Sequence, residues 1–260
     1  MSDTTAIPNS SGASKAPEAT LIAVILDRSG SMTKLREATI AGFNEFLSTQ
    51  QQQTDGGGAL MSLTQFDNQY EVNFIGEPIG NVPNLGIESY VPRGQTALYD
   101  AIGRTIHEVE TWTKERQWQE RILVLIITDG QENASREYDL AAVRALIEQK
   151  EKEGWNFAYM GANQDSFSEA GKLKIRADYV ANFACTDVGT AANFRRMARS
   201  ASQYRSSGSK GQTAPEFFNP PIPPSDPQAG KKSGTGTLTP PQPRGGLQWL
   251  KDLFNRKDNS

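Results

Sequence analysis

Two short and almost uninterrupted apolar runs constrain this chain most strongly. They read LIAVILD over residues 21–27 and RILVLIITD over residues 121–129. Such runs are typical of parallel strands that are covered on both faces, because neither face has to meet water. Each run ends in an aspartate. The sequence therefore predicts that two central strands each end in an acidic side chain.

Further apolar and amphipathic segments alternate along the chain. Besides the two runs, we expect strands at 59–67, 156–163 and 178–184, and at 70–77 an antiparallel edge strand that follows a tight three-residue link. Apolar residues at spacings of three and four predict helices at 34–52, 97–115, 138–153 and 187–204, with a short one near 165–173. This alternation predicts a doubly wound, mostly parallel α/β sheet with helices on both faces.

Composition divides the chain into four parts. Residues 1–19 are polar and lack apolar periodicity, which is typical of a disordered leader. Residues 20–205 carry the strands and helices of one domain. Residues 206–244 are rich in proline, glycine and serine, which predicts a flexible linker that contributes nothing to a core. Residues 245–260 return to an amphipathic pattern.

Charge and composition narrow the classes of function. The chain has 27 Lys and Arg against 30 Asp and Glu, a balance that argues against a general nucleic-acid binder. Its only cysteine, Cys185, can form neither an internal disulfide nor a cysteine zinc site, and we expect it to be buried at a strand end. No signal peptide and no apolar stretch of roughly 18 residues is present. We therefore expect a soluble, cytoplasmic protein.

Oxygen-bearing side chains follow the ends of the central strands. Asp27, Ser29 and Ser31 alternate in DRSGSM directly after the first run, and Asp129 ends the second. Thr96 precedes the helix of GQTALYDAIG. Asp27 and Ser29 could simply cap the following helix. Two carboxylates and three hydroxyls at one edge of a sheet would instead form the all-oxygen site that hard divalent cations such as Mg²⁺ prefer.

The segments DRSGSM, GQTALYDAI and LIITDGQ together resemble the metal-ion-dependent adhesion site (MIDAS) of von Willebrand factor type A (VWA) domains. The resemblance covers roughly residues 20–205 and implies the Rossmann-like VWA fold. It also implies a bound Mg²⁺, or Mn²⁺ or Ca²⁺, whose last coordination position is filled by an acidic side chain of a partner protein. The ligands implied in this sequence are Asp27, Ser29, Ser31, Thr96 and Asp129.

The resemblance favours a non-enzymatic, metal-dependent protein-binding module that acts as an adaptor or assembly factor. The alternative is a metal-assisted hydrolase or phosphatase. The sequence offers that alternative neither a Gly-x-Ser-x-Gly motif nor a phosphate-binding loop. Where a phosphatase of the haloacid dehalogenase type needs a second aspartate, two residues after Asp27, this chain has Ser29.

The C-terminal segment 245–260 predicts a short amphipathic helix, which is marginal without a surface to cover it. We expect a helix-in-groove contact with a second partner protein. Packing on its own domain and weak membrane association are the alternatives, and the small number of basic residues nearby argues against a membrane. The residues of this contact are Leu247, Trp249, Leu250, Leu253 and Phe254.

Overall fold

The computed structural model describes residues 19–118, 120–162, 166–207 and 217–218. Within these residues the chain forms one six-stranded sheet with the strand order β3-β2-β1-β4-β5-β6. The strands are β1 (Thr20–Asp27), β2 (Ala59–Phe66), β3 (Tyr70–Pro78), β4 (Arg121–Thr128), β5 (Trp155–Ala162) and β6 (Val180–Phe183).

Strands β1 and β4 form the centre of the sheet, as the two apolar runs predict. They pair in parallel, with Leu21 opposite Ile122 and Leu26 opposite Ile127, and every residue of both strands is buried. Strand β3 pairs antiparallel with β2 at the sheet edge, while the other described pairings are parallel. The predicted fold class and the antiparallel edge strand are confirmed.

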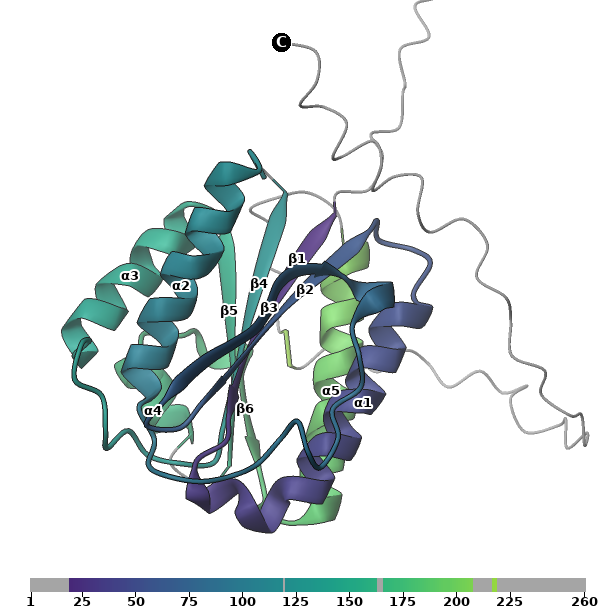
Figure 1. The fold of residues 1–260 in the computed structure, drawn as a ribbon. Coiled ribbons are helices and arrows are strands. Elements are labelled where there is room, and N and C mark those ends of the chain that lie inside the picture. Colours follow the sequence, from purple (N-terminus) through teal and green to yellow (C-terminus); the bar gives the residue numbers. More distant parts are fainter. Residues whose placement is uncertain (1–18, 119, 163–165, 208–216, 219–260) are drawn as a thin grey trace, which may run out of the picture.

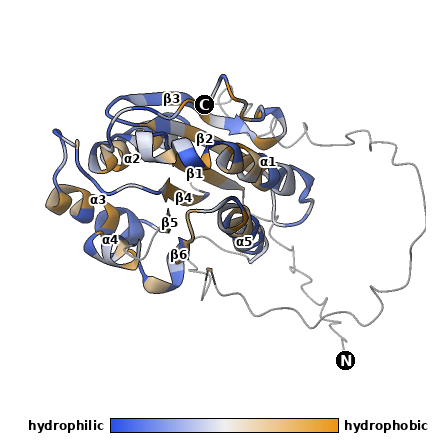
Figure 2. Cartoon of the chain, turned by 90° about the horizontal axis from the view of Figure 1, so that it is seen from below, coloured by the Kyte–Doolittle hydropathy of each residue, from blue (hydrophilic) through white to orange (hydrophobic). Residues whose placement is uncertain are grey.

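Helices cover both faces of the sheet. Figures 1 and 2 show α2, α3 and α4 on one face and α1 and α5 on the other. The helices are α1 (Arg36–Gln52), α2 (Leu98–Glu115), α3 (Leu140–Lys152), α4 (Ser166–Lys172) and α5 (Asp187–Ser206). Colouring by hydropathy places apolar residues on the strands and on the helix faces that meet them (Figure 2). No helix in the described part of the chain is long and apolar enough to cross a membrane.

Two local predictions need correction at β6. A turn of 3-10 helix occupies Ala177–Tyr179, so the strand is shorter than the expected 178–184. Cys185 lies beyond the strand end and is exposed, although its apolar context suggested burial. The chain has already left the sheet there, because the helix-capping residue Thr186 follows directly.

The strand order reverses between β1 and β4, and this reversal positions the polar loops. From β1 the chain crosses over α1 to β2 on one side, whereas β4 lies on the other side of β1. In open sheets of this kind the loops at the carboxyl ends of the two strands diverge and leave a crevice for a ligand. The loop after Asp27 and the loop that begins at Asp129 follow the carboxyl ends of these two strands.

Phe217 and Phe218 pack on the domain although they lie in the predicted linker. Both side chains are buried, with 2% and 1% of their surface exposed. The ring of Phe217 stacks on Tyr179 at a centroid distance of 5.0 Å and meets Tyr204 edge-on at 6.5 Å. The backbone N–H of Phe218 donates to the carbonyl of Asp178 (3.0 Å). The predicted linker has a low average hydrophobicity, and this average does not reveal that two of its residues belong to the core.

Replacing Phe217 and Phe218 with alanine should lower the free energy of unfolding by at least about 3 kcal/mol, because two buried aromatic rings leave cavities against Tyr179 and Tyr204. Urea denaturation measures the change. Val188→Ala, at an apolar residue that is 78% exposed, is the control and should leave the stability unaltered. A double variant as stable as wild type would show that the two rings do not pack on the domain.

Candidate metal centre

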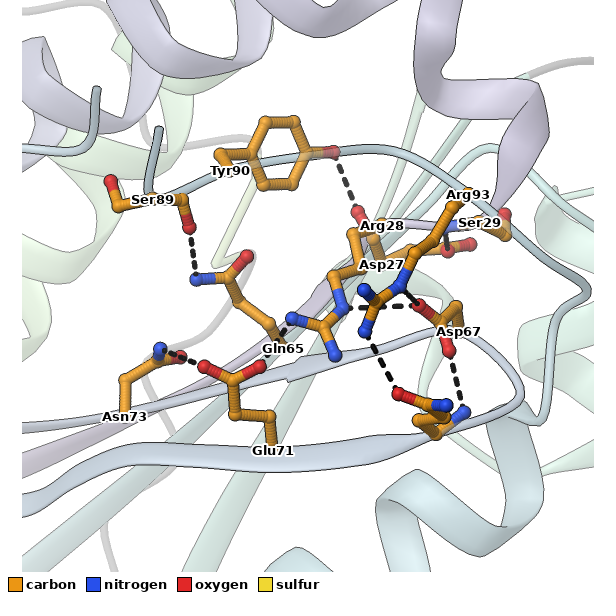
Figure 3. Close-up of polar contacts among 11 residues, drawn as sticks. Asp27, Arg28, Ser29, Gln65, Asp67, Glu71, Asn73, Ser89, Tyr90 and Arg93 are labelled. Carbon is orange, nitrogen blue, oxygen red and sulfur yellow. Dashed lines mark hydrogen bonds and ion pairs between the residues drawn. The ribbon is translucent and has the colours of Figure 1, made fainter. Parts of the chain in front are cut away.

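Asp27 ends β1 as a fully buried carboxylate (0% exposed). Its Oδ1 accepts a hydrogen bond from the backbone N–H of Ser29 (2.6 Å), and its Oδ2 accepts one from the hydroxyl of Thr128 (2.5 Å). The Tyr90 hydroxyl donates to the carbonyl of Asp27 (2.6 Å), which fixes the end of the strand from the side (Figure 3). These bonds hold the carboxylate in one orientation.

The serine hydroxyls extend this arrangement to Asp129. The Oγ atoms of Ser29 and Ser31 lie 3.0 Å apart, and the Ser31 hydroxyl donates to Oδ1 of Asp129 (2.5 Å). The side chain of Ser29 makes no capping bond to the helical turn that follows, so the capping alternative does not describe this residue. Ser31 is exposed while Asp27 is buried, and the group therefore opens to solvent at Ser31.

Thr96 faces the same group beside Gly130. A Cβ atom at position 130 would lie 2.7 Å from the Thr96 hydroxyl oxygen and 3.4 Å from the Ser31 hydroxyl oxygen. Two hydroxyls thus border one small space that only a residue without a side chain leaves open. With the hydrogen bonds that link Asp27, Ser29, Ser31 and Asp129, this contact brings all five predicted residues to one edge of the sheet.

The loop after Asp129 fixes the backbone of Thr96. The N–H of Thr96 donates to Oδ1 of Asn133 (2.9 Å), and the N–H groups of Asn133 and Ala134 both donate to the carbonyl of Thr96 (3.0 and 3.2 Å). The position of Thr96 relative to Asp129 is therefore set by backbone contacts and does not depend on its own side chain.

Helix α2 begins next to Thr96 without a capping side chain of its own, since Ala97 stands at its N-cap. The loop after Asp129 supplies the caps instead. Glu132 accepts from the N–H of Tyr99 (3.0 Å), and the hydroxyl of Ser135 accepts from the N–H of Asp100 (3.1 Å). Satisfying these free N–H groups stabilises the helix start and joins it to the loop.

Burial makes both carboxylates costly to ionise. The pKa of Asp27 is raised to about 6, mainly by burial and to a small extent by the charge of Asp129, while the hydrogen bonds from Thr128 and Ser29 lower it. Burial also raises the pKa of Asp129. A cation in front of the two carboxylates would relieve both costs. Carboxylate and hydroxyl oxygens fit a hard divalent cation.

Few of the five predicted metal ligands carry a charge. No group of three or more His, Cys, Asp and Glu side chains in the described residues is arranged to hold a metal ion. The predicted set contains only two carboxylates, with hydroxyls in the other three positions. The role of the five residues as metal ligands stays a prediction, which their convergence supports.

The sequence did not indicate the residues that support the site. Glu132, Asn133 and Ser135 come shortly after Asp129, but nothing in a single sequence distinguishes them from ordinary loop residues. Asp100 accepts hydrogen bonds from three backbone N–H groups of this loop, those of residues 136–138. A search for acidic residues close to the predicted ligands could have found Asp100 and Glu132, although not their partners.

Sequence comparison matches the chain to no family model and to no curated protein. Comparison of structures finds similar folds. Proximal thread matrix protein 1 from the mussel byssus is 18% identical, with a TM-score of 0.55 over 71% of this chain and 46% of that one. The vWF domain of the type V pili tip protein Mfa5 from Porphyromonas gingivalis is 10% identical, with a TM-score of 0.55 over 76% of this chain and 99% of that one.

A further structure of proximal thread matrix protein 1 is described as having a zinc-occupied MIDAS motif, and this chain matches it with 17% identity and a TM-score of 0.53 over 72% of this chain and 46% of that one. The chain thus spans about half the length of these mussel proteins. At such low identities the similarity establishes the fold alone. The chain has the VWA fold.

Gly130→Ala should weaken Mg²⁺ and Mn²⁺ binding at least about tenfold, because the added methyl group would displace the hydroxyl of Thr96. The backbone at Gly130 lies outside the left-handed region, so the fold should tolerate alanine. Gly86→Ala is the matched control, since a side chain there meets no other atom within 4 Å. Titration calorimetry measures both affinities. Equal binding by the two variants would place the metal elsewhere.

Proposed function

We propose that this protein is a non-enzymatic, divalent-metal-dependent protein-binding module that works inside the cell as an adaptor or assembly factor. The observation that carries this proposal is the hydrogen-bonded series from Asp27 through Ser29 and Ser31 to Asp129, with the Thr96 hydroxyl facing the same space. Mg²⁺ is the proposed ion, with Mn²⁺ or Ca²⁺ as substitutes, because every donor is oxygen.

The arrangement of donors suits recognition of an acidic partner. A divalent ion held here supplies a Lewis-acidic centre for an additional oxygen ligand. Asp27 is anchored by two hydrogen bonds, so it would hold its position when a partner binds or leaves. Ser31 and Thr96 contribute neutral oxygens, which leaves positive charge for a carboxylate of the partner. The exposed side of Ser31 gives that carboxylate its approach.

The similar structures support the proposal within limits. One of them has a metal-occupied MIDAS motif, and others are a pili tip protein and a pilus adhesin, SpaC from Lactobacillus rhamnosus GG. Those descriptions concern proteins that are at most 18% identical to this chain. Binding of a protein through the metal is therefore our proposal for this chain, and so are its identity as an adaptor and its location.

The alternative, a metal-assisted hydrolase, lacks support at the site. The single histidine, His107, has 53% of its side chain exposed and lies 3.9 Å from Glu110 on the same helix. It is nine residues beyond Leu98, where α2 starts, which is about 14 Å along the helix axis. No imidazole therefore stands beside Ser29 or Ser31 to activate a hydroxyl. Turnover of phosphate esters that depends on Mg²⁺ and is lost in Asp27→Ala would favour the hydrolase.

The second predicted contact lies outside the described residues. Leu247, Trp249, Leu250, Leu253 and Phe254 all belong to the segment 245–260, and their role as a docking motif stays a proposal. A test of that motif has to retain Phe217 and Phe218, which are part of the core. A chain shortened after Pro220 should therefore fold and bind metal normally but lose one partner, and Trp249→Ala with Phe254→Ala should lose the same partner.

Millimolar Mg²⁺ or Mn²⁺ should raise the melting temperature of the protein by roughly 5 to 10 °C at 100 times the dissociation constant, because the ion binds only the folded state. Asp27→Asn should stay folded, since an amide can keep the bonds with Ser29 and Thr128, and should lose the response to metal. Differential scanning calorimetry measures both. An equal rise in melting temperature on adding metal to the two proteins would contradict the five-residue site.

Capture of a partner from the native cell extract should depend on the same residues. Wild-type protein in Mg²⁺ should retain a protein that is released by EDTA and never captured by Asp27→Asn. A partner that stays bound in EDTA would be held by another surface. Replacing acidic residues of the captured partner one at a time should identify a single carboxylate whose loss equals the effect of EDTA.

A further inference from the structure

Three segments meet beside the predicted metal ligands and are joined by backbone hydrogen bonds. The N–H of Arg28 donates to the carbonyl of Phe66 (2.7 Å), and the N–H of Arg93 donates to the carbonyl of Arg28 (2.7 Å). The N–H of Ala97, the residue after Thr96, donates to the carbonyl of Asp67 (3.0 Å). The end of β2 and the turn after it thus connect the loop that follows Asp27 with the loop that carries Thr96.

The carboxylate of Asp67 lies where these segments meet and is fully buried (0% exposed). Its Oδ2 accepts from Nε of Arg28 (3.2 Å) and from Nε of Arg93 (2.9 Å), and its Oδ1 accepts from the N–H of Gln69 (2.5 Å). Figure 3 shows the two guanidinium groups converging on this one carboxylate. One side chain therefore contacts both metal-site loops and its own turn.

The charges in this cluster balance. Arg28 is buried and also donates through Nη1 to Glu71 (2.6 Å), so two carboxylates compensate two guanidinium groups. The compensation matters because Arg28 directly follows Asp27, and an unpaired cation there would repel a divalent ion.

Close packing at Gly94 also fixes how the Thr96 loop approaches the turn between β2 and β3. Gly94 lies between Arg93 and Thr96 with a φ of +67°, and a Cβ there would lie 2.1 Å from the side-chain oxygen of Asn68. The loop can approach the turn this closely only because it has glycine at this point. The carbonyl of Gly94 in turn accepts from the N–H of Gly30, in the DRSGSM loop (3.1 Å).

We propose that Asp67 is a positioning residue of the metal site: by binding Arg28 and Arg93 it holds the Asp27 loop and the Thr96 loop at the separation that one cation needs. This inference rests on the proposed function. It assigns Asp67 no contact with the metal and no contact with the partner. Residues that orient metal ligands from behind contribute about 10- to 100-fold to metal affinity.

The test compares two variants that each remove a carboxylate from two cations. Asp67→Asn removes the negative charge that Arg28 and Arg93 share, and its amide nitrogen cannot accept the hydrogen bonds that one of the two carboxylate oxygens accepts. Glu110→Gln does the same to Lys114 and the buried Lys150, on α2 about 18 Å along the helix from its start. Mn²⁺ alone is the probe, titrated by water-proton relaxation, and calorimetry gives the melting temperature of each metal-free protein.

Both variants should melt earlier than wild type, but only Asp67→Asn should bind Mn²⁺ about 10- to 100-fold more weakly. Wild-type affinity in Asp67→Asn would overturn the inference, and so would an equal loss of affinity in Glu110→Gln. Failure of the wild-type protein itself to bind Mn²⁺ would be a different result, because it would remove the proposed function and not only the role of Asp67.

Arg93→Gln keeps the test available if Asp67→Asn does not fold, since 52% of the Arg93 side chain is exposed. This change removes a positive charge near the cation, so electrostatics alone would tighten Mn²⁺ binding. Loss of the Arg93–Asp67 contact, which holds the Thr96 loop, would instead weaken Mn²⁺ binding. We expect weaker binding, and a dissociation constant equal to or below that of wild type would overturn the inference.

Discussion

Parallel hydrogen bonding between β1 and β4 brings the carboxyl ends of two wholly buried strands together. Hydrophobic burial drives this pairing, and each strand then delivers an aspartate to the same edge of the sheet. The core thereby places two carboxylates at a buried edge, and burial raises the pKa of both Asp27 and Asp129, with a smaller contribution to the Asp27 pKa from the charge of Asp129. A bound cation would offset this cost of burial, because it compensates the charge of the buried carboxylates.

The loops around the site are held mostly by bonds between the backbone and polar side chains. Glu132 and Ser135 cap α2 from the loop after Asp129, and Asp67 joins the other two loops through arginines. These contacts use none of the five predicted ligand side chains, so forming them does not compete with the binding of an ion. The ligands would therefore lose little conformational entropy when an ion binds, which favours affinity for a weakly charged set of donors.

The sequence predicted the fold well because its signals are local. Continuous apolar runs and the stripe of Leu98, Ile102 and Ile106 report burial directly, and their elements lie close to the expected boundaries. The grouping of Asp27, Ser29, Ser31 and Asp129 was also predictable, since the ends of adjacent parallel strands must meet. Asp67 and Glu132 were not, because their partners come from segments distant in sequence. Composition failed at Phe217 and Phe218, where two buried rings interrupt a polar stretch.

The anchoring of Phe217 and Phe218 determines how the domain would carry a mechanical load. The ring of Phe217 contacts Tyr204, whose carbonyl accepts from Arg121 at the amino end of β4, whereas Asp129 follows the carboxyl end of that strand. Tension between a partner on the metal and the residues beyond 218 would run along the central strands. The hydrogen bonds between β1 and β4 would then be loaded in shear, all together, and would not open one after another.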